Sequence, residues 1–356
     1  MTDSKDIEKL TAEAVELLRE MVAIPSPSFH EDAVCSHISN WLTAKGVEHE
    51  RVGNNIIAEH IVDPSKPTLM LCAHIDTVVP CEGYTFDPYK PENCPTDMIQ
   101  GLGSNDDGAS AVSMIAAFRF FGTCTTIPNI TLVLTCEEER SGKGGMTGLW
   151  GKRLNRIDYA IVGEPTGMKA ATSERGLLVI DATAHGVSGH AARNAGKNAL
   201  YIALEDIERL RKHEFTKVSP KMGRVNLNVT QICAGSAHNV IPDRCDFVID
   251  IRPTEQYSNE EILQELQAIC ESELKPRNLA NRSSATKEDS PLQKTAERMG
   301  IETFSSATTS DWMRITCDSI KMGPGESTRS HRKDEFVYID EVRNAIEIYI
   351  EFIEKI

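Results

Sequence analysis

Histidines and carboxylates stand at the ends of several apolar stretches of the sequence. His74 and Asp76 follow the run 68–73, and residues two apart on a strand point to the same face of the sheet. Glu164 ends a second apolar run, and His331 lies in a late polar stretch. Such a mixture of nitrogen and oxygen ligands suits zinc or cobalt rather than calcium or haem. Taken alone, the pair of His74 and Asp76 is better explained as an ordinary polar end of a strand.

Two acidic clusters extend this set of candidate ligands. Asp106 lies in the glycine-rich turn Gly101–Gly108 just before an apolar helix, where a carboxylate either caps the helix or binds a ligand. Glu137, Glu138 and Glu139 directly follow an apolar strand. Gathering like charges where the backbone leaves the core is unfavourable unless cations or protons compensate them. The three glutamates therefore indicate a cation site.

The order of these motifs resembles the M20 family of metallopeptidases, and within it the acetylornithine deacetylase and succinyl-diaminopimelate desuccinylase branch. The resemblance covers nearly the whole chain. It rests on five motifs in the family's order: His74-Ile75-Asp76-Thr77, Gly101-Leu102-Gly103-Ser104-Asn105-Asp106, Glu138-Glu139, Gly163-Glu164-Pro165-Thr166 and His331. Each motif is a weak signal by itself, whereas five in this order are specific.

The resemblance implies a centre of two divalent metal ions, Zn2+ or Co2+. The implied ligands are two residues for each ion and one that bridges both: His74 and Glu164, Glu139 and His331, and Asp106. By the same resemblance Asp76 would orient His74, and Glu138 would be the general base that takes a proton from water. Two such ions make water more acidic and polarise a carbonyl group, which is the chemistry that amide hydrolysis needs.

The resemblance also implies residues that contact the substrate. The loop Gly186–His190 looks like the family's loop whose histidine donates a hydrogen bond to the oxyanion, in some members from the neighbouring subunit. Judged by its residues alone, His190 equally fits a surface histidine in a glycine-rich turn. The other candidates resemble positions that grip the substrate carboxylate, a task suited to arginine's planar fork: Arg252 and Asn239, with Arg175 and Thr309 as weaker candidates.

Helical and strand patterns alternate through the first part of the chain. Apolar residues at helical spacing predict helices, and short apolar runs predict buried strands. The predicted helices are Ile7–Met21, Ala33–Lys45, Ala109–Phe120 and Gly144–Trp150, and the predicted strands are Asn55–Ile61, Thr68–Ala73, Ile130–Cys136 and Asp158–Val162. This alternation predicts an α/β architecture with a largely parallel or mixed sheet that is covered on both faces.

The pattern changes after about Met168. Apolar and polar residues now alternate, as in half-exposed antiparallel strands, between stretches of helical spacing. The predicted strands are Leu177–Ala184, Asn226–Ile232 and Cys245–Ile251, and the predicted helices are Asn198–Lys212, Asn259–Lys275 and the final Ile339–Ile353. We therefore predict a smaller α+β domain, residues 169–288, inserted between catalytic parts 1–168 and 289–356. The resemblance implies a zinc-peptidase-like catalytic domain and a two-layer sandwich through which a homodimer forms.

Composition and charge restrict the function further. With 356 residues, 40% of them hydrophobic, the chain can bury a core in each of two domains. The segment Met1–Leu10 lacks the apolar stretch of a signal peptide, and no eighteen apolar residues run together. A net charge of −15 argues against nucleic acid and anionic membranes as partners. Ten cysteines without a C-x-x-C pair indicate reduced, mostly buried thiols, so we expect a cytoplasmic protein.

The resemblance implies an amidohydrolase that removes an acetyl or succinyl group from a small N-acyl amino acid, such as N-acetylornithine or N-acetylcitrulline in arginine biosynthesis. A succinyl-diaminopimelate or succinylornithine desuccinylase, a dipeptidase and an aminoacylase share the metal chemistry and differ at the substrate rim. There, Cys81–Gln100 and Ser327–His331 depart from the family's usual pattern, which leaves the acyl group open. A binding protein without activity would also keep the fold, but it would have no need of Glu138.

Overall fold

The computed structural model describes residues 4–92, 94–193 and 195–356, and the chain divides into two compact units. The larger unit comprises the chain up to Thr172 together with Thr286–Phe304 and Ser310–Ile356. The smaller unit comprises Ser173–Ala285 and Ser305–Thr309. The larger unit is thus made from both ends of the chain, and the smaller one is inserted between them. Of the N-terminal segment considered above, residues 1–3 lie outside the described residues.

Helices and strands alternate in the larger unit. Its helices are α1 (Ser4–Val22), α2 (Asp32–Ala44), α3 (Ala109–Phe120), α4 (Met146–Leu149), α7 (Pro291–Arg298) and α8 (Ile339–Lys355). Its strands are β1 (Glu50–Val52), β2 (Asn55–His60), β3 (Thr68–His74), β4 (Met98–Gln100), β5 (Asn129–Thr135), β6 (Tyr159–Val162), β16 (Asp318–Lys321) and β17 (Phe336–Tyr338). Two further strands, β7 (Ala170–Glu174) and β15 (Thr303–Ser306), begin in this unit and end in the smaller one.

The main sheet of the larger unit is mixed, as predicted. Its strands follow the order β1-β2-β5-β3-β6-β16-β7. The pairs β5·β3, β3·β6 and β6·β16 are parallel, whereas β1·β2, β2·β5 and β16·β7 are antiparallel. The four parallel strands therefore bring their carboxyl ends to one edge of the sheet, which is where open α/β sheets place their binding sites.

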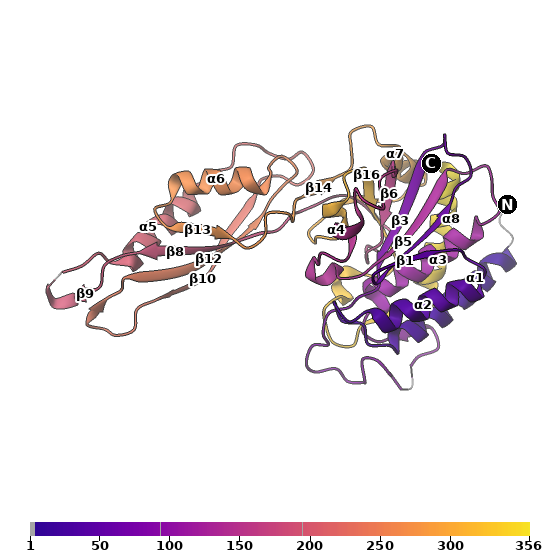
Figure 1. Ribbon diagram of the computed structural model, residues 1–356, viewed down its shortest axis with the longest axis horizontal. Helices are drawn as coiled ribbons and strands as arrows, with labels where there is room; N and C mark the ends of the chain where they lie inside the picture. The colour runs from indigo at the N-terminus through magenta and orange to yellow at the C-terminus, as the bar shows by residue number, and fades with distance from the viewer. Residues whose placement is uncertain (1–3, 93, 194) are drawn as a thin grey trace. The chain divides into compact units, whose positions relative to one another are not determined.

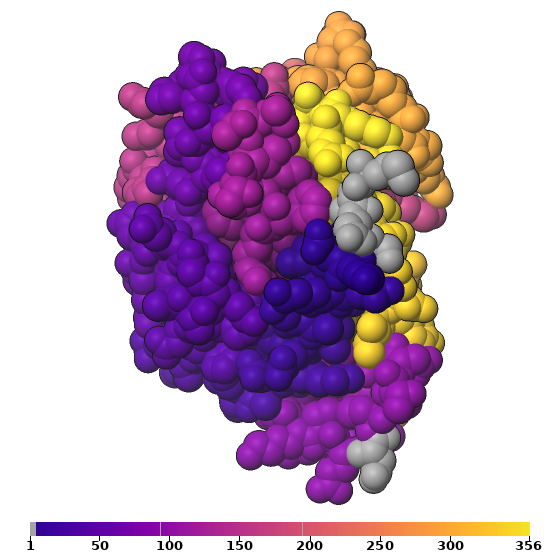
Figure 2. All heavy atoms as spheres, turned by 90° about the vertical axis from the view of Figure 1, so that its right-hand side faces the viewer, coloured from indigo at the N-terminus to yellow at the C-terminus, as the bar shows by residue number. Residues whose placement is uncertain are grey.

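Both faces of this sheet are buried, which confirms the prediction. Successive residues of β3 point to opposite faces, so Leu69 and Leu71 join one core while Met70 and Cys72 join the other. Helices α1, α3 and α8 pack on one another and cover the first face (Figure 1). Figure 2 shows the indigo N-terminal part of the chain beside the yellow C-terminal part on the surface of this unit. Trp312 and residues of α4 belong to the second core.

The smaller unit is a two-layer α+β structure, also as predicted. Its helices are α5 (Ala199–Lys212) and α6 (Asn259–Ile269), and its strands are β8 (Leu178–His185), β9 (Gly189–His190), β10 (Asn226–Ala234), β11 (Val240–Ile241), β12 (Arg244–Arg252), β13 (Glu273–Pro276) and β14 (Ser284–Ala285). Four of these form an antiparallel sheet in the order β10-β12-β8-β13. Residues of β8 and β12 alternate between buried and partly exposed, because α5 and α6 cover only one face.

Two expectations from the sequence are wrong. The helix predicted over Asn259–Lys275 ends at Ile269, and β13 follows it. The carboxylate of Asp206 accepts the N–H groups of Glu271 and Ser272 at 3.0 and 2.8 Å, so the chain leaves the helix there and pairs with β8. All ten cysteines are free thiols, but only four of them are buried.

Among the described residues, no helix has the length and apolar character needed to cross a membrane.

Candidate metal centre

The side chains predicted to bind metal come from five segments of the larger unit. His74 is the last residue of β3, Glu139 follows β5, and Glu164 follows β6, so these three lie at the carboxyl ends of neighbouring parallel strands. Asp106 lies in the segment Ser104–Gly108 that leads into α3, and its own backbone is extended there, with φ −120° and ψ 98°. His331 lies in the loop before β17. The topology thus explains how residues far apart in the sequence share one edge of the sheet.

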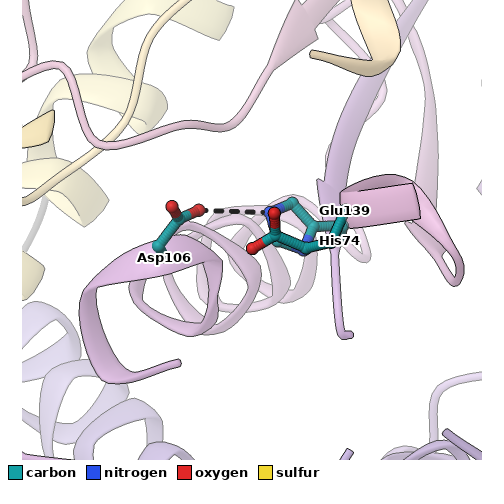
Figure 3. Close-up of side chains that lie close together, drawn as sticks. All are labelled: His74, Asp106 and Glu139. Atoms are coloured by element: carbon teal, nitrogen blue, oxygen red, sulfur yellow. Dashed lines mark hydrogen bonds and ion pairs between the residues drawn. The ribbon is translucent and has the colours of Figure 1, made fainter. Parts of the chain in front are cut away.

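The carboxylate of Asp106 lies between two imidazole rings. Nε2 of His74 is 3.2 Å from Oδ1 of Asp106 (Figure 3), and Nε2 of His331 is 3.6 Å from Oδ2. Each oxygen of the carboxylate therefore faces a different histidine. This is the arrangement that a carboxylate needs in order to bridge two ions, because each oxygen can then share one ion with one histidine.

Two triads of possible ligands share His74. The ligand atoms of His74, Asp106 and Glu139 lie within 4.8 Å of one another, and so do those of His74, Glu138 and Glu164. Oε2 of Glu139 is also 2.9 Å from Nε2 of His331. The cluster thus offers histidine nitrogens and carboxylate oxygens to two adjacent positions, a donor set that fits the divalent ions implied by the sequence.

The pKa values of these groups reflect an excess of buried negative charge. Burial raises the pKa of the Glu138 and Glu164 carboxyls well above the usual value, and neighbouring carboxylates add to the effect. Burial disfavours the charged form of His74, yet its contacts with Asp106 and Asp76 hold its pKa well above the usual value. The hydrogen bond with Glu139 raises the pKa of His331 to about 9. Protons compensate here for charge that divalent cations would neutralise directly, so the residues fit such cations.

Asp76 contacts this cluster through both its backbone and its side chain. Nδ1 of His74 lies 2.9 Å from the backbone carbonyl oxygen of Asp76 and 3.5 Å from the carboxylate. The carboxylate accepts the backbone N–H groups of Glu138 and Glu139 at 3.0 and 3.2 Å, and the hydroxyl of Ser28 at 2.6 Å. The backbone carbonyl therefore makes the closer contact with the His74 ring, and the side chain holds the acidic segment that follows β5.

Glycine allows the tight turn that carries Asp106. Gly103 has a φ of +78°, in the left-handed region that favours glycine. A Cβ on Gly108 would lie 2.4 Å from the carbonyl oxygen of Gly103, closer than atoms in contact can approach. Gly108 is also the N-cap of α3, without a side-chain hydrogen bond, so the alternative that Asp106 caps this helix is wrong.

The predicted substrate-binding residues belong to the smaller unit. His190 pairs with Val240 in the β9·β11 ladder, which brings it close along the backbone to Asn239, and both side chains are exposed. Arg252 forms a two-point ion pair with Asp250, at 2.9 and 3.2 Å.

Arg175 and Thr309 lie elsewhere in the same unit. The guanidinium of Arg175 donates to the carbonyl oxygens of Arg224 and Arg252 at 3.0 and 3.2 Å, and to that of Met222. Burial lowers the pKa of Arg175. These bonds give Arg175 a part in joining segments of this unit. Thr309 is partly buried in the short segment Ser305–Thr309.

Sequence reasoning missed three buried acids around the cluster. Glu31 accepts the N–H of Glu137 at 3.1 Å, Asp311 accepts the hydroxyl of Thr135 at 2.7 Å, and Glu335 accepts the N–H of Asp106 at 2.9 Å. Burial raises the pKa of Asp311 to about 6 and that of Glu335 to about 8. None of the three directly follows an apolar run, so the local pattern does not mark them.

Two sequence models of known families match parts of the chain. The model of the peptidase dimerisation domain matches residues 172–278, which lie almost entirely in the smaller unit. The model of peptidase family M28 matches residues 55–221. The second match includes each of the candidate ligands described above except His331.

Known proteins resemble the chain over nearly its whole length. The succinyl-diaminopimelate desuccinylase of Wolbachia pipientis subsp. Culex pipiens is 26% identical over 377 residues, covering 96% of this chain and 92% of that protein. The acetylornithine deacetylase of Proteus mirabilis is 26% identical over 361 residues, covering 91% of each. A solved structure, described as a dinuclear metal binding peptidase of the M20 family from Bacillus subtilis, has a TM-score of 0.76 at 15% identity, covering 98% of this chain and 100% of that one.

The fold is an α/β mixed-sheet catalytic unit with an inserted antiparallel-sheet dimerisation domain. This architecture, the candidate His/Asp/Glu site and the matching families define a class of metal-dependent hydrolases. The chain is similar to metallopeptidases of the M20 and M28 families.

Proposed function

We propose that this chain is a two-metal amidohydrolase that removes an acetyl or succinyl group from a small N-acyl amino acid, such as N-acetylornithine or N-acetylcitrulline in arginine biosynthesis. The observation that carries the proposal is the carboxylate of Asp106, whose two oxygens face His74 at 3.2 Å and His331 at 3.6 Å. The likeness to an acetylornithine deacetylase and a succinyl-diaminopimelate desuccinylase, over 91% or more of this chain, supports the choice of substrate class.

In this proposal the ligands divide into two sets that share one residue. His74 and Glu164 would hold one ion, Glu139 and His331 would hold the other, and Asp106 would be shared by both. Zinc or cobalt bound there would make water more acidic and polarise the carbonyl of the scissile amide. The backbone carbonyl of Asp76 fixes the ring of His74, and its carboxylate fixes the segment that carries Glu139. A ligand set oriented in this way binds metal more tightly than the same side chains left free.

Glu138 is the proposed general base. Its carboxylate accepts a proton from the attacking water and later delivers that proton to the nitrogen of the leaving amine. Its ligand-type oxygen lies within 4.8 Å of those of His74 and Glu164, beside the proposed reaction centre.

The smaller unit supplies the remaining proposed groups. His190 donates a hydrogen bond to the oxyanion, and Arg252 and Asn239 bind the substrate carboxylate, with Arg175 and Thr309 as secondary candidates. The match to a peptidase dimerisation domain supports a homodimer formed through this unit. If His190 acts across the dimer, mixing His190→Ala with Glu138→Gln subunits should restore activity in the hybrids. Hybrids that stay inactive would place every catalytic group within one subunit.

A peptidase or aminoacylase activity is the second candidate. It is favoured by the TM-score of 0.76 to a structure described as a peptidase, because the same metal chemistry cleaves peptide bonds. A panel of acetyl- and succinyl-ornithine, acetylcitrulline, succinyl-diaminopimelate and dipeptides should separate the candidates by kcat/KM. The proposal expects the highest value for an acetyl or succinyl amino acid. A higher value for a dipeptide would overturn it, and zinc-loaded protein without turnover on any substrate would indicate a binding protein.

A further inference from the structure

Glu335 is a buried carboxyl group behind the proposed bridging ligand. Only 2% of its surface is exposed. Its Oε1 accepts the backbone N–H groups of Asn105 and Asp106, each at 2.9 Å. One oxygen thus holds two consecutive amides of the turn that carries Asp106. Glu335 follows His331 by four residues, so it also belongs to the segment that carries another proposed ligand.

Further bonds join the same two segments in both directions. Oδ1 of Asn105 accepts the N–H of Glu326 at 3.0 Å, and its Nδ2 donates to the carbonyl oxygen of Glu326 and to the hydroxyl of Ser330, both at 3.2 Å. The N–H of Gly101 donates to the carbonyl oxygen of Glu335 at 2.9 Å. The turn 101–108 and the segment 326–335 are therefore connected at both ends of the stretch that contains His331.

His331 needs such a connection more than the other proposed ligands do. Its side chain is 56% exposed, whereas that of His74 is 2% exposed and fixed by packing at the end of β3. An exposed side chain on a loop keeps its position only if the loop is held elsewhere. Before His331, the loop is held by the bonds of Asn105 to Glu326 and Ser330. After it, the hydroxyl of Tyr84 donates to the carbonyl oxygen of Arg332 at 3.2 Å and the N–H of Thr85 donates to the carboxylate of Asp334 at 2.8 Å. On this later side, Glu335 is the anchor that ties the loop directly to the turn of Asp106.

We propose that Glu335 is a positioning residue that fixes the turn of Asp106 to the loop of His331, so that both side chains can reach the same divalent ion. This inference rests on the proposed function. Glu335 acts through hydrogen bonds to the backbone and is assigned no contact with substrate. Because one neutral or charged oxygen can accept both amides, an amide side chain of the same length should replace it, whereas a methyl group should not.

The test compares Glu335→Ala and Glu335→Gln with a matched control, Asp206→Ala. Asp206 lies in the smaller unit, is fully buried, and likewise accepts two consecutive N–H groups, those of Glu271 and Ser272, at 3.0 and 2.8 Å. Removing this carboxylate should lower the melting temperature, because two N–H groups lose their acceptor. It should leave zinc binding unchanged, because no proposed ligand lies in that unit.

Zinc titration of chelator-treated protein, with a competing dye, gives the two dissociation constants. Wild type should bind two ions, and Glu335→Ala should raise the weaker constant by about 10- to 100-fold, the usual effect of losing a residue that orients ligands. Glu335→Gln should restore wild-type affinity. The visible absorption spectrum of the cobalt-loaded proteins should change in Glu335→Ala and return in Glu335→Gln, since it reports the geometry of the ligands.

The possible outcomes separate the inference from the function on which it rests. If the wild-type protein binds no zinc, both the proposed function and the inference are wrong. If the wild-type protein binds two ions and Glu335→Ala has the same zinc affinity and the same cobalt spectrum, only the inference is wrong. If Glu335→Ala does not fold, Glu335→Asp replaces it, because the shorter side chain should fall out of reach of one amide. Full affinity in Glu335→Asp would also overturn the inference, and a weakened second ion would support it.

Discussion

The carboxylate of Asp76 accepts the backbone N–H of Glu138 at 3.0 Å. Its other oxygen accepts the N–H of Glu139 at 3.2 Å and the hydroxyl of Ser28 at 2.6 Å. One side chain at the end of β3 therefore holds the two glutamates after β5 in a fixed backbone conformation. The positions of the proposed base Glu138 and the proposed ligand Glu139 thus depend on Asp76, which is far from both in the sequence.

Replacing Asp76 by alanine should weaken metal binding. The N–H groups of Glu138 and Glu139 lose their acceptor, so we expect an affinity for zinc about 10- to 100-fold lower. Competition with a chelating dye measures it. Ser28→Ala is the control, because it removes only a donor to Asp76 and leaves both amides with their acceptor. An equal loss in Ser28→Ala would contradict the explanation.

Replacing Glu138 by glutamine should separate metal binding from turnover. The amide cannot accept a proton from water, so kcat should fall on the order of 10²- to 10⁴-fold. Metal content, measured by atomic absorption, should stay at two ions per chain. The reverse result, with metal lost and the remaining enzyme fast, would mean that Glu138 is a ligand and Glu139 the base.

Dialysis against a chelator should abolish hydrolysis and lower the melting temperature. Adding zinc or cobalt should restore both, because an ion that binds only the folded state stabilises it, by about 2.7 kcal/mol at a concentration of 100 times its Kd. Calorimetry with increasing zinc checks this, and His331→Ala should show a smaller increase. Calcium serves as the control, since this donor set does not suit it. Full activity after chelation would refute metal dependence.

Replacing Gly108 by alanine should disturb the turn of Asp106. The new methyl group would lie 2.4 Å from the carbonyl oxygen of Gly103 and 2.7 Å from Cδ1 of Leu18. Relief of this overlap moves the backbone, so we expect about 1–3 kcal/mol of lost stability and weaker zinc binding. Urea unfolding and zinc titration measure these effects. The control is Gly122→Ala, whose closest atom would be at 3.3 Å, and a similar loss there would count against this reasoning.

The ion pairs of Glu13 should make stability depend on pH in a defined direction. Although partial burial opposes ionisation, hydrogen bonds from Lys45 and Arg119, at 2.9 and 2.7 Å, lower the pKa of Glu13 below 4.5 in the folded protein. A lowered folded-state pKa means that this contribution is present above pH 4.5 and is lost as the pH falls through the lowered value.

Glu13→Gln tests this expectation. The variant should be less stable than wild type at pH 7, by no more than about 1 kcal/mol because these pairs remain partly solvated. The difference should disappear at acid pH, where Glu13 is itself neutral. Urea unfolding of both proteins across the pH range measures it, and a difference that grows on acidification would show the opposite sign.

Three of the candidate ligands, His74, Glu139 and Glu164, could be predicted because they follow apolar runs. β3, β5 and β6 are buried on both faces, so each reads as an unbroken apolar stretch, and the polar residues just after it must gather at one edge of the sheet. The mixed sheet followed from the alternation of apolar runs with stretches of helical spacing, and the inserted α+β domain followed from the change to alternating apolar and polar residues; the structure confirms both.

The residues that hold the ligands could not be predicted in this way. Glu31 and Glu335 act by accepting backbone N–H groups from segments more than 100 residues away, and periodicity carries no information about such partners. The local pattern also gave a wrong prediction at β13: its residues continue the helical spacing of α6, so a helix was predicted there, but they pair with β8 as a strand. Strand β7 was missed because its residues, Ala170–Glu174, are small or polar even though they are buried.

Helix α1 packs against helix α8, although they are the first and last helices of the chain. During synthesis, α1 and the segments after β3, β5 and β6 emerge from the ribosome long before α8 and His331 do. The smaller unit is nearly continuous in sequence, so it can complete its core while the larger one still waits for its C-terminal part. Newly made chains can therefore pass through a stage in which the smaller unit is folded while the larger one still exposes the apolar faces that α8 will cover.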